Sequence, residues 1–302
     1  MKRRQKVWGI TLTLSGLLLS GCSQSTQSAI EINSANATSI TATEVAKYSR
    51  VVALANGSAE IISALGQKKI LVGRDIASTD SDLKSVPVVT SGHQVVPEKI
   101  LALKPDLVLI DASTGPATAL NALTQAGANV VKISESWAVG EIPAKVNGIA
   151  HALAIDSDGK RLSDAITNSR AKISKPARVA FLYLRGGSAS YLIGGKGSGA
   201  DSIIESIGGT DIGAAKLTNP FNTMTAEAMA SLNPDLILVM SKGLESVGGV
   251  KGLVALPGVA QTSAGKKGRI VAVDDSLLLS FGPRTADLQR QLAAAIDKVM
   301  AQ

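Results

Sequence analysis

Two segments of the chain show the same succession of a helical end, a Pro-Asp turn and an uninterrupted apolar run. They extend from Ile100 to Ile110 and from Met229 to Val239, 129 residues apart. Proline ends a helix because it has no backbone N–H and clashes with the preceding turn. A continuous short apolar run is typical of a parallel strand that is buried on both faces. The pattern therefore predicts the same helix and strand unit twice.

A second repeated pattern precedes each of these units. Residues 57–66 and 199–209 each start with small residues, continue with an apolar stripe and end on glycine. These features indicate a short helix with a glycine C-cap. The first helix follows an apolar strand at 51–54, and the second follows strand-like runs at 179–184 and 191–193. We therefore expect an α/β protein with two doubly wound lobes and a ligand cleft between them.

The stretch between the lobes, residues 139–175, has no strand signal. Its apolar residues recur at the spacing of a helix face, as at Ile142, Val146, Ile149, Leu153, Leu162 and Ile166. This pattern predicts one long helix that joins the lobes as a spine, with a potential break near 156–159. The lobes on its two sides are then residues 46–138 and 176–302.

The N-terminus has the pattern of a secretory signal peptide, which we assign to residues 1–21. Basic residues precede an apolar run from Val7 to Leu19, which is shorter than the roughly 20 residues that span a bilayer. Cys22 follows Leu-Ser-Gly, a sequence that resembles a bacterial lipobox and implies lipidation of its sulfur. Residues 22–45 are mostly small and polar, which predicts a lipidated cysteine followed by a flexible tether.

Charge and composition exclude several functional classes. Removing the four basic residues of the signal lowers the formal net charge from +7 to +3, and no run of Lys or Arg remains that suggests nucleic acid binding. Cys22 is the single cysteine, so the chain forms no internal disulfide. The remaining residues are numerous enough for two lobes.

The chain resembles the substrate-binding proteins of ABC importers that have a single helical spine, the class that carries ferric siderophores, cobalamin and heme. Within this class it is most similar to the HmuT-type hemin-binding lipoproteins. The resemblance covers essentially the whole body, and its residues include Gly57–Ile62, Ser91–His93, Leu103–Leu109, Phe181–Gly186, Tyr191–Asp201, Gly243–Gly249, Leu256–Thr262 and Phe281–Thr285.

This resemblance implies a monomer that is anchored by lipid outside the cell membrane. Its ligand would be heme b, carried as cargo for iron acquisition, and its partners would be an ABC permease and its ATPase. In the wider class one glutamate per lobe docks with the permease. Glu60 and Glu205 hold equivalent positions in the two repeated helices and match this role.

Ferric heme in such a protein needs axial ligands, and imidazole and phenolate both ligate heme iron. His93 lies in a glycine-containing turn before a helix, and it matches the slot where related carriers place a ligand. Tyr183 ends the first strand of the second lobe, so its phenol can face the cleft from the opposite wall. The plainer alternatives are a solvated loop histidine and a core aromatic residue.

Three further residues are candidates for supporting the ligand. Arg185 shares a strand face with Tyr183, and a nearby cation favours the phenolate. Arg284 offers a guanidinium fork for a heme carboxylate, with a surface ion pair as the alternative. Tyr191 is a second choice for the phenolate ligand. Tyr48 and His151 are interpreted as structural.

Three other functions compete with heme transport. A ferric siderophore or cobalamin carrier would have the same fold but would not coordinate iron itself. A manganese or zinc carrier needs several His, Asp or Glu ligands, and the chain has two histidines. A hydrolase would need a Gly-x-Ser-x-Gly elbow. Lys196 interrupts that motif at Ser198, and no histidine follows His151, so we expect no enzymatic activity.

Overall fold

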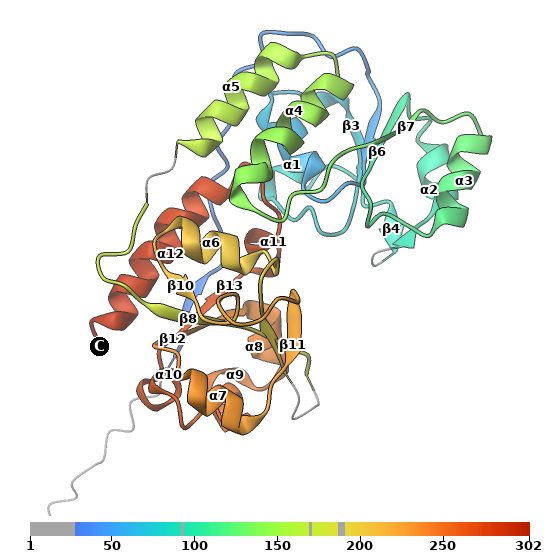
Figure 1. Cartoon of the computed structure of the whole chain (residues 1–302). Coiled ribbons are helices and arrows are strands. Elements are labelled where there is room, and N and C mark those ends of the chain that lie inside the picture. Colours follow the sequence, from blue (N-terminus) through green and yellow to red (C-terminus); the bar gives the residue numbers. More distant parts are fainter. Residues whose placement is uncertain (1–27, 92–93, 169–170, 187–190) are drawn as a thin grey trace, which may run out of the picture.

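The computed structural model describes residues 28–91, 94–168, 171–186 and 191–302, which form two α/β lobes (Figure 1). The repeated helix and strand pattern predicts this fold class, and the structure confirms it. None of the helices in these residues has the length and apolar content that crossing a membrane requires.

The N lobe contains a sheet of four parallel strands in the order β3-β2-β6-β7. A short antiparallel pair, β4 and β5, accompanies this sheet. The strands are β2 (Val51–Ala53), β3 (Leu71–Arg74), β4 (Thr90–Ser91), β5 (Gln94–Val95), β6 (Leu107–Ile110) and β7 (Val130–Lys132). The helices are α1 (Ser58–Ala64), α2 (Pro97–Ala102), α3 (Ala117–Gln125), α4 (Ile142–Ala152) and α5 (Asp156–Thr167), with 3-10 turns η1 (Lys68–Ile70), η2 (Ser81–Leu83) and η3 (Val139–Glu141).

The C lobe contains a sheet in the order β1-β13-β12-β8-β9-β11, and β10 also pairs with β8. The pairings of β9 are antiparallel, and the other pairings in this sheet are parallel. The strands are β1 (Ile30–Ile32), β8 (Arg178–Tyr183), β9 (Leu192–Gly194), β10 (Thr210–Asp211), β11 (Phe221–Thr223), β12 (Leu236–Met240) and β13 (Ile270–Val273). The helices are α6 (Ala200–Ser206), α7 (Ala226–Leu232), α8 (Ser241–Ser246), α9 (Gly249–Ala255), α10 (Ser263–Lys267), α11 (Asp275–Leu278) and α12 (Thr285–Met300).

The two Pro-Asp turns have the same structural role in both lobes. Asp106 accepts a hydrogen bond of 2.9 Å from the backbone N–H of Arg50, just before β2. Asp235 accepts one of 3.1 Å from the N–H of Arg178, at the start of β8. Each arginine also donates to a carbonyl group at the end of the helix that precedes the Pro-Asp turn, which is α2 for Arg50 and α7 for Arg178. The repeated sequence therefore connects the end of a helix to the start of a central strand in each lobe.

Residues 30–47, which we call the N-terminal strap, differ from the expected tether. β1 adds a parallel strand to the edge of the C-lobe sheet, next to β13. The chain then crosses to the N lobe, where the N–H of Ile40 donates to the carbonyl of Ala64 at 2.9 Å. The prediction of a flexible tether is therefore wrong for residues 30–45, because three strand residues and backbone contacts fix this polar segment.

Asp158 on α5 holds the strap against the N lobe. Its carboxylate is fully buried and accepts hydrogen bonds from the N–H and the hydroxyl of Thr43 at 2.9 and 2.6 Å. It also accepts one of 3.0 Å from the N–H of Glu44 and pairs with Arg161. Burial alone would raise the pKa of Asp158, but these hydrogen bonds outweigh burial and hold the pKa well below its ordinary value.

The expected single spine is instead two helices, α4 and α5, which pack along each other. The chain turns between them at Ala154, whose φ of 59° is left-handed and ends the helix before the expected break. Gly159 permits the close approach, because a Cβ at this position would come within 2.3 Å of the Ala150 side chain. In Figure 1, α5 runs back from the N lobe toward α12 of the C lobe, and these two helices are in contact.

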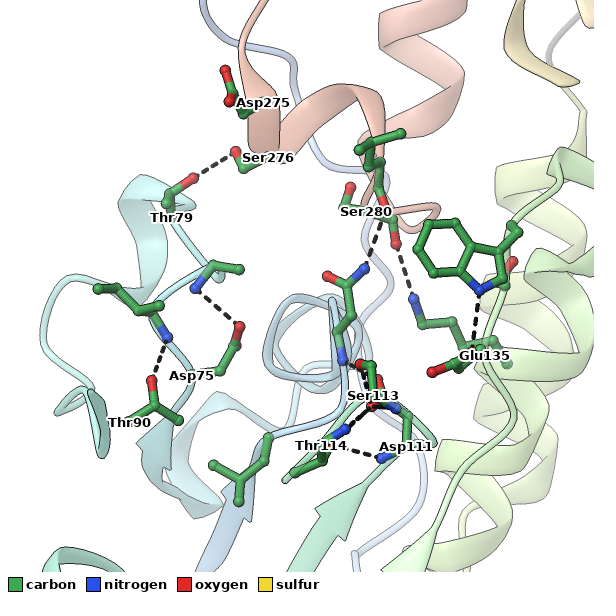
Figure 2. A pocket seen from close by; sticks show the side chains of 18 of the residues that line it. Asp75, Thr79, Thr90, Asp111, Ser113, Thr114, Glu135, Asp275, Ser276 and Ser280 are labelled. Atoms are coloured by element: carbon green, nitrogen blue, oxygen red, sulfur yellow. Dashed lines mark hydrogen bonds between the residues drawn. The ribbon is translucent and has the colours of Figure 1, made fainter. Parts of the chain in front are cut away.

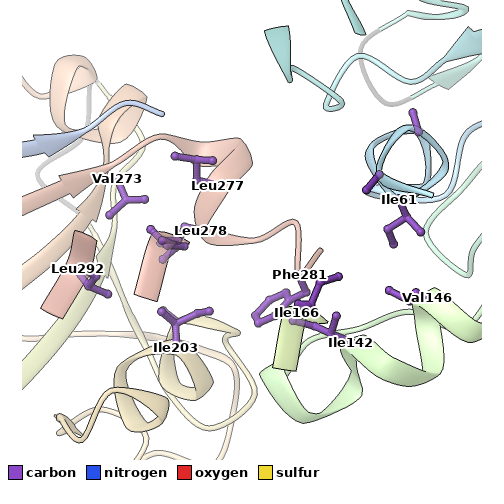
Figure 3. Packing of buried hydrophobic residues seen from close by; sticks show 14 of the residues in the cluster. Ile61, Ile142, Val146, Ile166, Ile203, Val273, Leu277, Leu278, Phe281 and Leu292 are labelled. Atoms are coloured by element: carbon purple, nitrogen blue, oxygen red, sulfur yellow. The ribbon is translucent and has the colours of Figure 1, made fainter. Parts of the chain in front are cut away.

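One cluster of buried apolar side chains continues from the N lobe into the C lobe. Figure 3 shows Ile61 and Val146 of the N lobe at one end and Leu278 and Leu292 of the C lobe at the other, with Phe281 between them. Phe281 is 1% exposed. Burying a side chain of this size contributes about 1.5–3 kcal/mol. The lobes are thus joined by a shared core as well as by the chain.

We predict that Asp158→Ala lowers the free energy of unfolding by roughly 1–3 kcal/mol, because it removes the buried acceptor of the hydrogen bonds from Thr43 and Glu44. Urea unfolding at pH 7 measures this change. Since the pKa of Asp158 is lowered in the folded state, the charged carboxylate stabilises above pH ~4 and this contribution is lost in acid. The difference between wild type and variant should therefore shrink as the pH falls.

Asp164→Ala is the matched control, because Asp164 lies on the same helix in an exposed pair with Lys160. We expect this control to change stability by less than about 0.5 kcal/mol. Equal effects of the two substitutions would show that the contacts of Asp158 with the strap contribute no more to stability than an exposed ion pair.

Candidate functional site

A cavity of about 560 Å³ lies between the lobes, where the carboxyl ends of parallel strands from both sheets meet. Ligands of doubly wound sheets bind at this edge. Asn56, Asp75 and Asp111 follow β2, β3 and β6 of the N lobe, and Tyr183 ends β8 of the C lobe. Figure 2 shows Asp75, Asp111 and Glu135 of the N lobe and, facing them, Ser276 and Ser280 of the C lobe.

Two buried carboxylates at the strand ends bond mainly to their own loops. Asp111 accepts hydrogen bonds from the N–H of Asn56 at 2.7 Å and from both the N–H and the hydroxyl of Ser113 and Thr114. Burial would raise the pKa of Asp111, but these donors hold it below its ordinary value. Burial raises the pKa of Asp75, although Ser78 and Ala77 donate to it. These carboxylates shape the loops and offer little to a ligand.

Lys145 on α4 is a buried cation at the cavity. Its side chain is 2% exposed, and its ammonium group donates to the carbonyl of Ser280 in the other lobe at 2.9 Å. Burial lowers the pKa of Lys145 to about 8, against the opposing effect of Asp111 and Glu60. Sequence reasoning missed this residue, because a lysine on a helix between apolar neighbours looks like a solvated side chain.

On the C-lobe side of the cavity, Tyr183 contacts the cation of Arg185 and the aromatic ring of Phe221. The phenol lines the cavity and accepts hydrogen bonds of 3.3 and 3.1 Å from the guanidinium of Arg185. That guanidinium also lies 5.1 Å from the centre of the Tyr183 ring. Phe221 packs on the same ring at 5.3 Å, tilted by 55°. Tyr183 therefore lies at the cleft, as its place at a strand end predicts, and its role as an iron ligand stays a prediction.

Exposed apolar side chains gather at this cleft. Ile76 and Trp137 line the cavity and are 47% and 43% exposed, and Phe221, which packs on Tyr183, is 38% exposed. Large apolar side chains that are exposed together mark a surface that binds a partner or ligand. Sequence reasoning did not single out Trp137. Its position just after the apolar run of β7 was the available signal.

Tyr191 does not reach the cleft, which corrects its assignment as a second choice of ligand. The residue is 4% exposed in the core of the C lobe, and its hydroxyl donates to the carbonyl of Pro257 at 2.7 Å. Burial raises the pKa of Tyr191 to about 12. A buried phenol with this partner serves packing and is unavailable to an iron centre.

The predicted roles of Arg284 in binding a heme carboxylate and of Glu60 in docking a permease are also corrected, because these two side chains bind each other. Arg284 is 6% exposed and Glu60 is 3% exposed, and the guanidinium grips both oxygens of the carboxylate, with one contact at 3.0 Å. Burial raises the pKa of Glu60, and Arg284 offsets part of this effect. Neither side chain is therefore free to bind a heme carboxylate or a permease. Glu205 is exposed on α6, and its role in docking stays a prediction.

The remaining candidates are either outside the described residues or away from the cavity. His93 and Cys22 fall outside the residues that the structure describes. Thr90 and Val95, which lie on β4 and β5, both line the cavity. Tyr48 accepts a hydrogen bond from Asn129, and exposed His151 contacts Asp156. The described ranges contain no group of three or more His, Cys, Asp or Glu side chains that could hold a metal ion.

Comparisons with known proteins show that the chain is similar to binding proteins of transport systems. A family model described as periplasmic binding protein matches residues 51–277. The chain is 26% identical over 320 residues to the uncharacterized ABC transporter substrate-binding lipoprotein YvrC of Bacillus subtilis (strain 168), with 98% of each chain covered.

Solved structures of heme-binding proteins are similar to this chain along most of its length. The heme binding protein HmuT is 28% identical with a TM-score of 0.77, covering 89% of this chain and 98% of that one. The periplasmic heme-binding protein RhuT from Roseiflexus sp. RS-1 is 34% identical with a TM-score of 0.76, covering 83% and 98%. BhuT in complex with two hemes is 30% identical with a TM-score of 0.75, covering 83% and 98%.

We predict that Arg284→Met lowers the free energy of unfolding by about 3–5 kcal/mol, because Glu60 then remains buried without its partner. The double variant Glu60→Met with Arg284→Met should recover most of this loss, since two apolar side chains replace the pair. Urea unfolding of the single and double variants measures both effects. Arg290→Met is the control, because Arg290 is 61% exposed in its pair with Asp287. A loss no larger than that of the control would contradict the prediction.

We also predict a distinct pH dependence of stability from Lys145. Its pKa is about 8 in the folded protein, below the ordinary 10.5, so the unfolded chain binds more protons between these values. The free energy of unfolding of wild type should therefore rise with pH in this window, relative to Lys145→Met. Urea unfolding at several pH values from 7 to ~10.5 measures the difference. A constant difference would show that the ammonium group keeps its ordinary proton affinity.

Proposed function

The chain belongs to the periplasmic binding protein family, and on this premise we propose that it captures ferric heme for an ABC importer. The family and its solved relatives are substrate-binding proteins of transport systems. The observation that carries the ligand assignment is the phenol of Tyr183, held by Arg185 in a cleft with exposed apolar side chains. Cys22 is proposed as the lipid-anchored residue of the exported chain.

Tyr183 and Arg185 form the part of the site that would bind the iron. A phenolate oxygen is a known haem ligand. The guanidinium of Arg185 donates to this oxygen at 3.1 Å, so a positive charge lies where the phenolate would form. Phe221 supports the ring from the side, which fixes its direction. Binding of ferric iron at this oxygen therefore needs little rearrangement of the wall.

The solved HmuT structures give this assignment a second support. They include alanine variants of a histidine, of a tyrosine and of an arginine two residues after that tyrosine. Tyr183 and Arg185 have the same spacing. We propose that His93 supplies the opposing nitrogen ligand, because Thr90 and Val95 on either side of it line the cavity.

The chemistry of the cavity favours a flat apolar ligand with acidic groups over a hydrophilic chelate. Ile76 and Trp137 offer apolar surface, and Met240 adds to it from the C lobe. Lys242 lines the cavity and is exposed, and Arg185 is exposed beside Tyr183. Both cations can therefore pair with carboxylates of a ligand. Heme combines an apolar macrocycle with two propionates, which suits this distribution.

Capture would involve a modest closure of the lobes. The shared apolar core, the strap and the pair of Glu60 with Arg284 connect the lobes in several places. Sliding or rocking by small amounts is compatible with such contacts, whereas wide opening at a hinge would expose buried apolar surface. The permease and ATPase would then take the ligand from a carrier that changes shape little.

We predict that the purified protein gives a Soret band of a coordinated ferric heme when titrated with hemin. Tyr183→Phe and His93→Ala should each change the spectrum, because each removes one proposed ligand. Arg185→Ala should weaken binding and leave a tyrosinate spectrum, since it removes only the supporting charge. Absorption spectroscopy with hemin at known concentrations measures all four proteins.

Tyr191→Phe is the matched control, because its hydroxyl lies in the core and contacts Pro257. This variant should bind hemin with the spectrum of the wild type. The heme proposal is wrong if hemin mixed with the wild-type protein keeps the absorption spectrum of free hemin. That result would favour a siderophore or cobalamin as the ligand.

A further inference from the structure

We propose that Trp137 is the surface on which the planar ligand stacks, and that this residue selects flat aromatic ligands. The inference rests on the proposed function, because it assigns the wall that receives the porphyrin ring. Trp137 comes from the segment between β7 and η3, on the N-lobe side of the cavity. It lines the same cavity as Tyr183.

The backbone of Trp137 is held in place by Glu141. One carboxylate oxygen of Glu141 accepts hydrogen bonds from the N–H of Trp137 at 2.7 Å and of Ala138 at 3.1 Å. The next residue, Val139, donates its N–H to the hydroxyl of Ser202 on α6 at 2.9 Å. The segment is therefore fixed to both lobes before any ligand arrives.

The indole of Trp137 has its polar group satisfied within the protein. Its N–H donates to the carboxylate of Glu135 at 3.2 Å. A buried or ligand-covered indole normally needs such a partner. Because Glu135 provides it, a ligand that covers the ring does not have to supply a hydrogen bond. The apolar π-surface of the ring is then available for stacking without a further polar contact.

The exposure of Trp137 is unusual for a residue fixed in this way. Trp137 is 43% exposed, while most large apolar side chains of the described residues are buried in the three clusters. An exposed tryptophan contributes little to the fold, whereas covering its ring with a flat ligand removes apolar surface of both from water. Lys145, which lines the same cavity, already donates to the carbonyl of Ser280.

Stacking on Trp137 would act independently of iron coordination. An aromatic contact adds to affinity through the ring face, and it is present for any flat macrocycle. Coordination by Tyr183 requires the metal. The two contributions are therefore separable with a porphyrin that contains iron and one that does not.

The test compares hemin with metal-free protoporphyrin IX on wild type, Trp137→Ala, Trp137→Phe and Tyr183→Phe. Dissociation constants come from absorption titrations at one pH and salt concentration, and circular dichroism checks that each variant is folded. We expect Trp137→Ala to raise the dissociation constants of both porphyrins by about 3- to 10-fold. Trp137→Phe keeps an aromatic ring face and should lose less affinity for both porphyrins. Tyr183→Phe should weaken the binding of hemin and leave the binding of protoporphyrin IX unchanged.

Val45→Ala is the control for loss of an exposed apolar side chain, because Val45 is 92% exposed and does not line the cavity. It should leave both constants unchanged. Hemin binding by wild type with no effect of Trp137→Ala overturns this inference and leaves the proposed function intact. An effect of Trp137→Ala on hemin alone also overturns it, since stacking does not depend on iron. Absence of hemin binding by wild type overturns both.

Discussion

The apolar core that the two lobes share is the constraint on which the rest of the structure depends. Ile61 and Val146 pack in one cluster with Phe281 and Leu292, so neither lobe can turn far without exposing these side chains. The pair of Glu60 with Arg284 lies at the same junction and is costly to separate, because each partner would be left buried and charged. The cavity therefore has a nearly fixed width, and its ligand must fit between walls that are already in place.

The strap and the shared core together explain why the site needs no long hinge. The chain passes between the lobes in the strap and again between α5 and β8. The loop after α11 also contacts the N lobe, where Lys145 donates to the carbonyl of Ser280. Thr79 and Ser276 also meet across the lobes, through a hydrogen bond of 2.6 Å between their hydroxyls. These contacts in several places limit how far the lobes can move apart.

The sequence predicts those parts of the structure that local patterns encode. The two Pro-Asp turns, the buried strands after them and Tyr183 at a strand end all follow from short runs of residues. The strap was missed because three residues of β1 are too few to show an alternation. The break at Ala154 was misplaced, because tertiary packing of α4 on α5 decides where the helix ends. Arg284 and Glu60 lie 224 residues apart, so their pairing has no local signal. Trp137 is a single residue after a strand, and only the cavity distinguishes it.

The charges of the cleft can be reconciled with an acidic ligand only after the hydrogen bonds are known. By residue type, Asp75, Asp111, Glu135 and Asp275 outnumber Lys145 and Lys242 among the lining residues, which suggests repulsion of heme propionates. Asp75 and Asp111 are, however, bound by donors of the N-lobe loops. Glu135 accepts from the indole N–H of Trp137, and Asp275 accepts from the N–H of Lys242. Lys242 and, beside Tyr183, Arg185 remain exposed on the C-lobe side. The N-lobe wall therefore offers the ring of Trp137, and the C-lobe wall offers the ring of Tyr183 with the cations of Arg185 and Lys242.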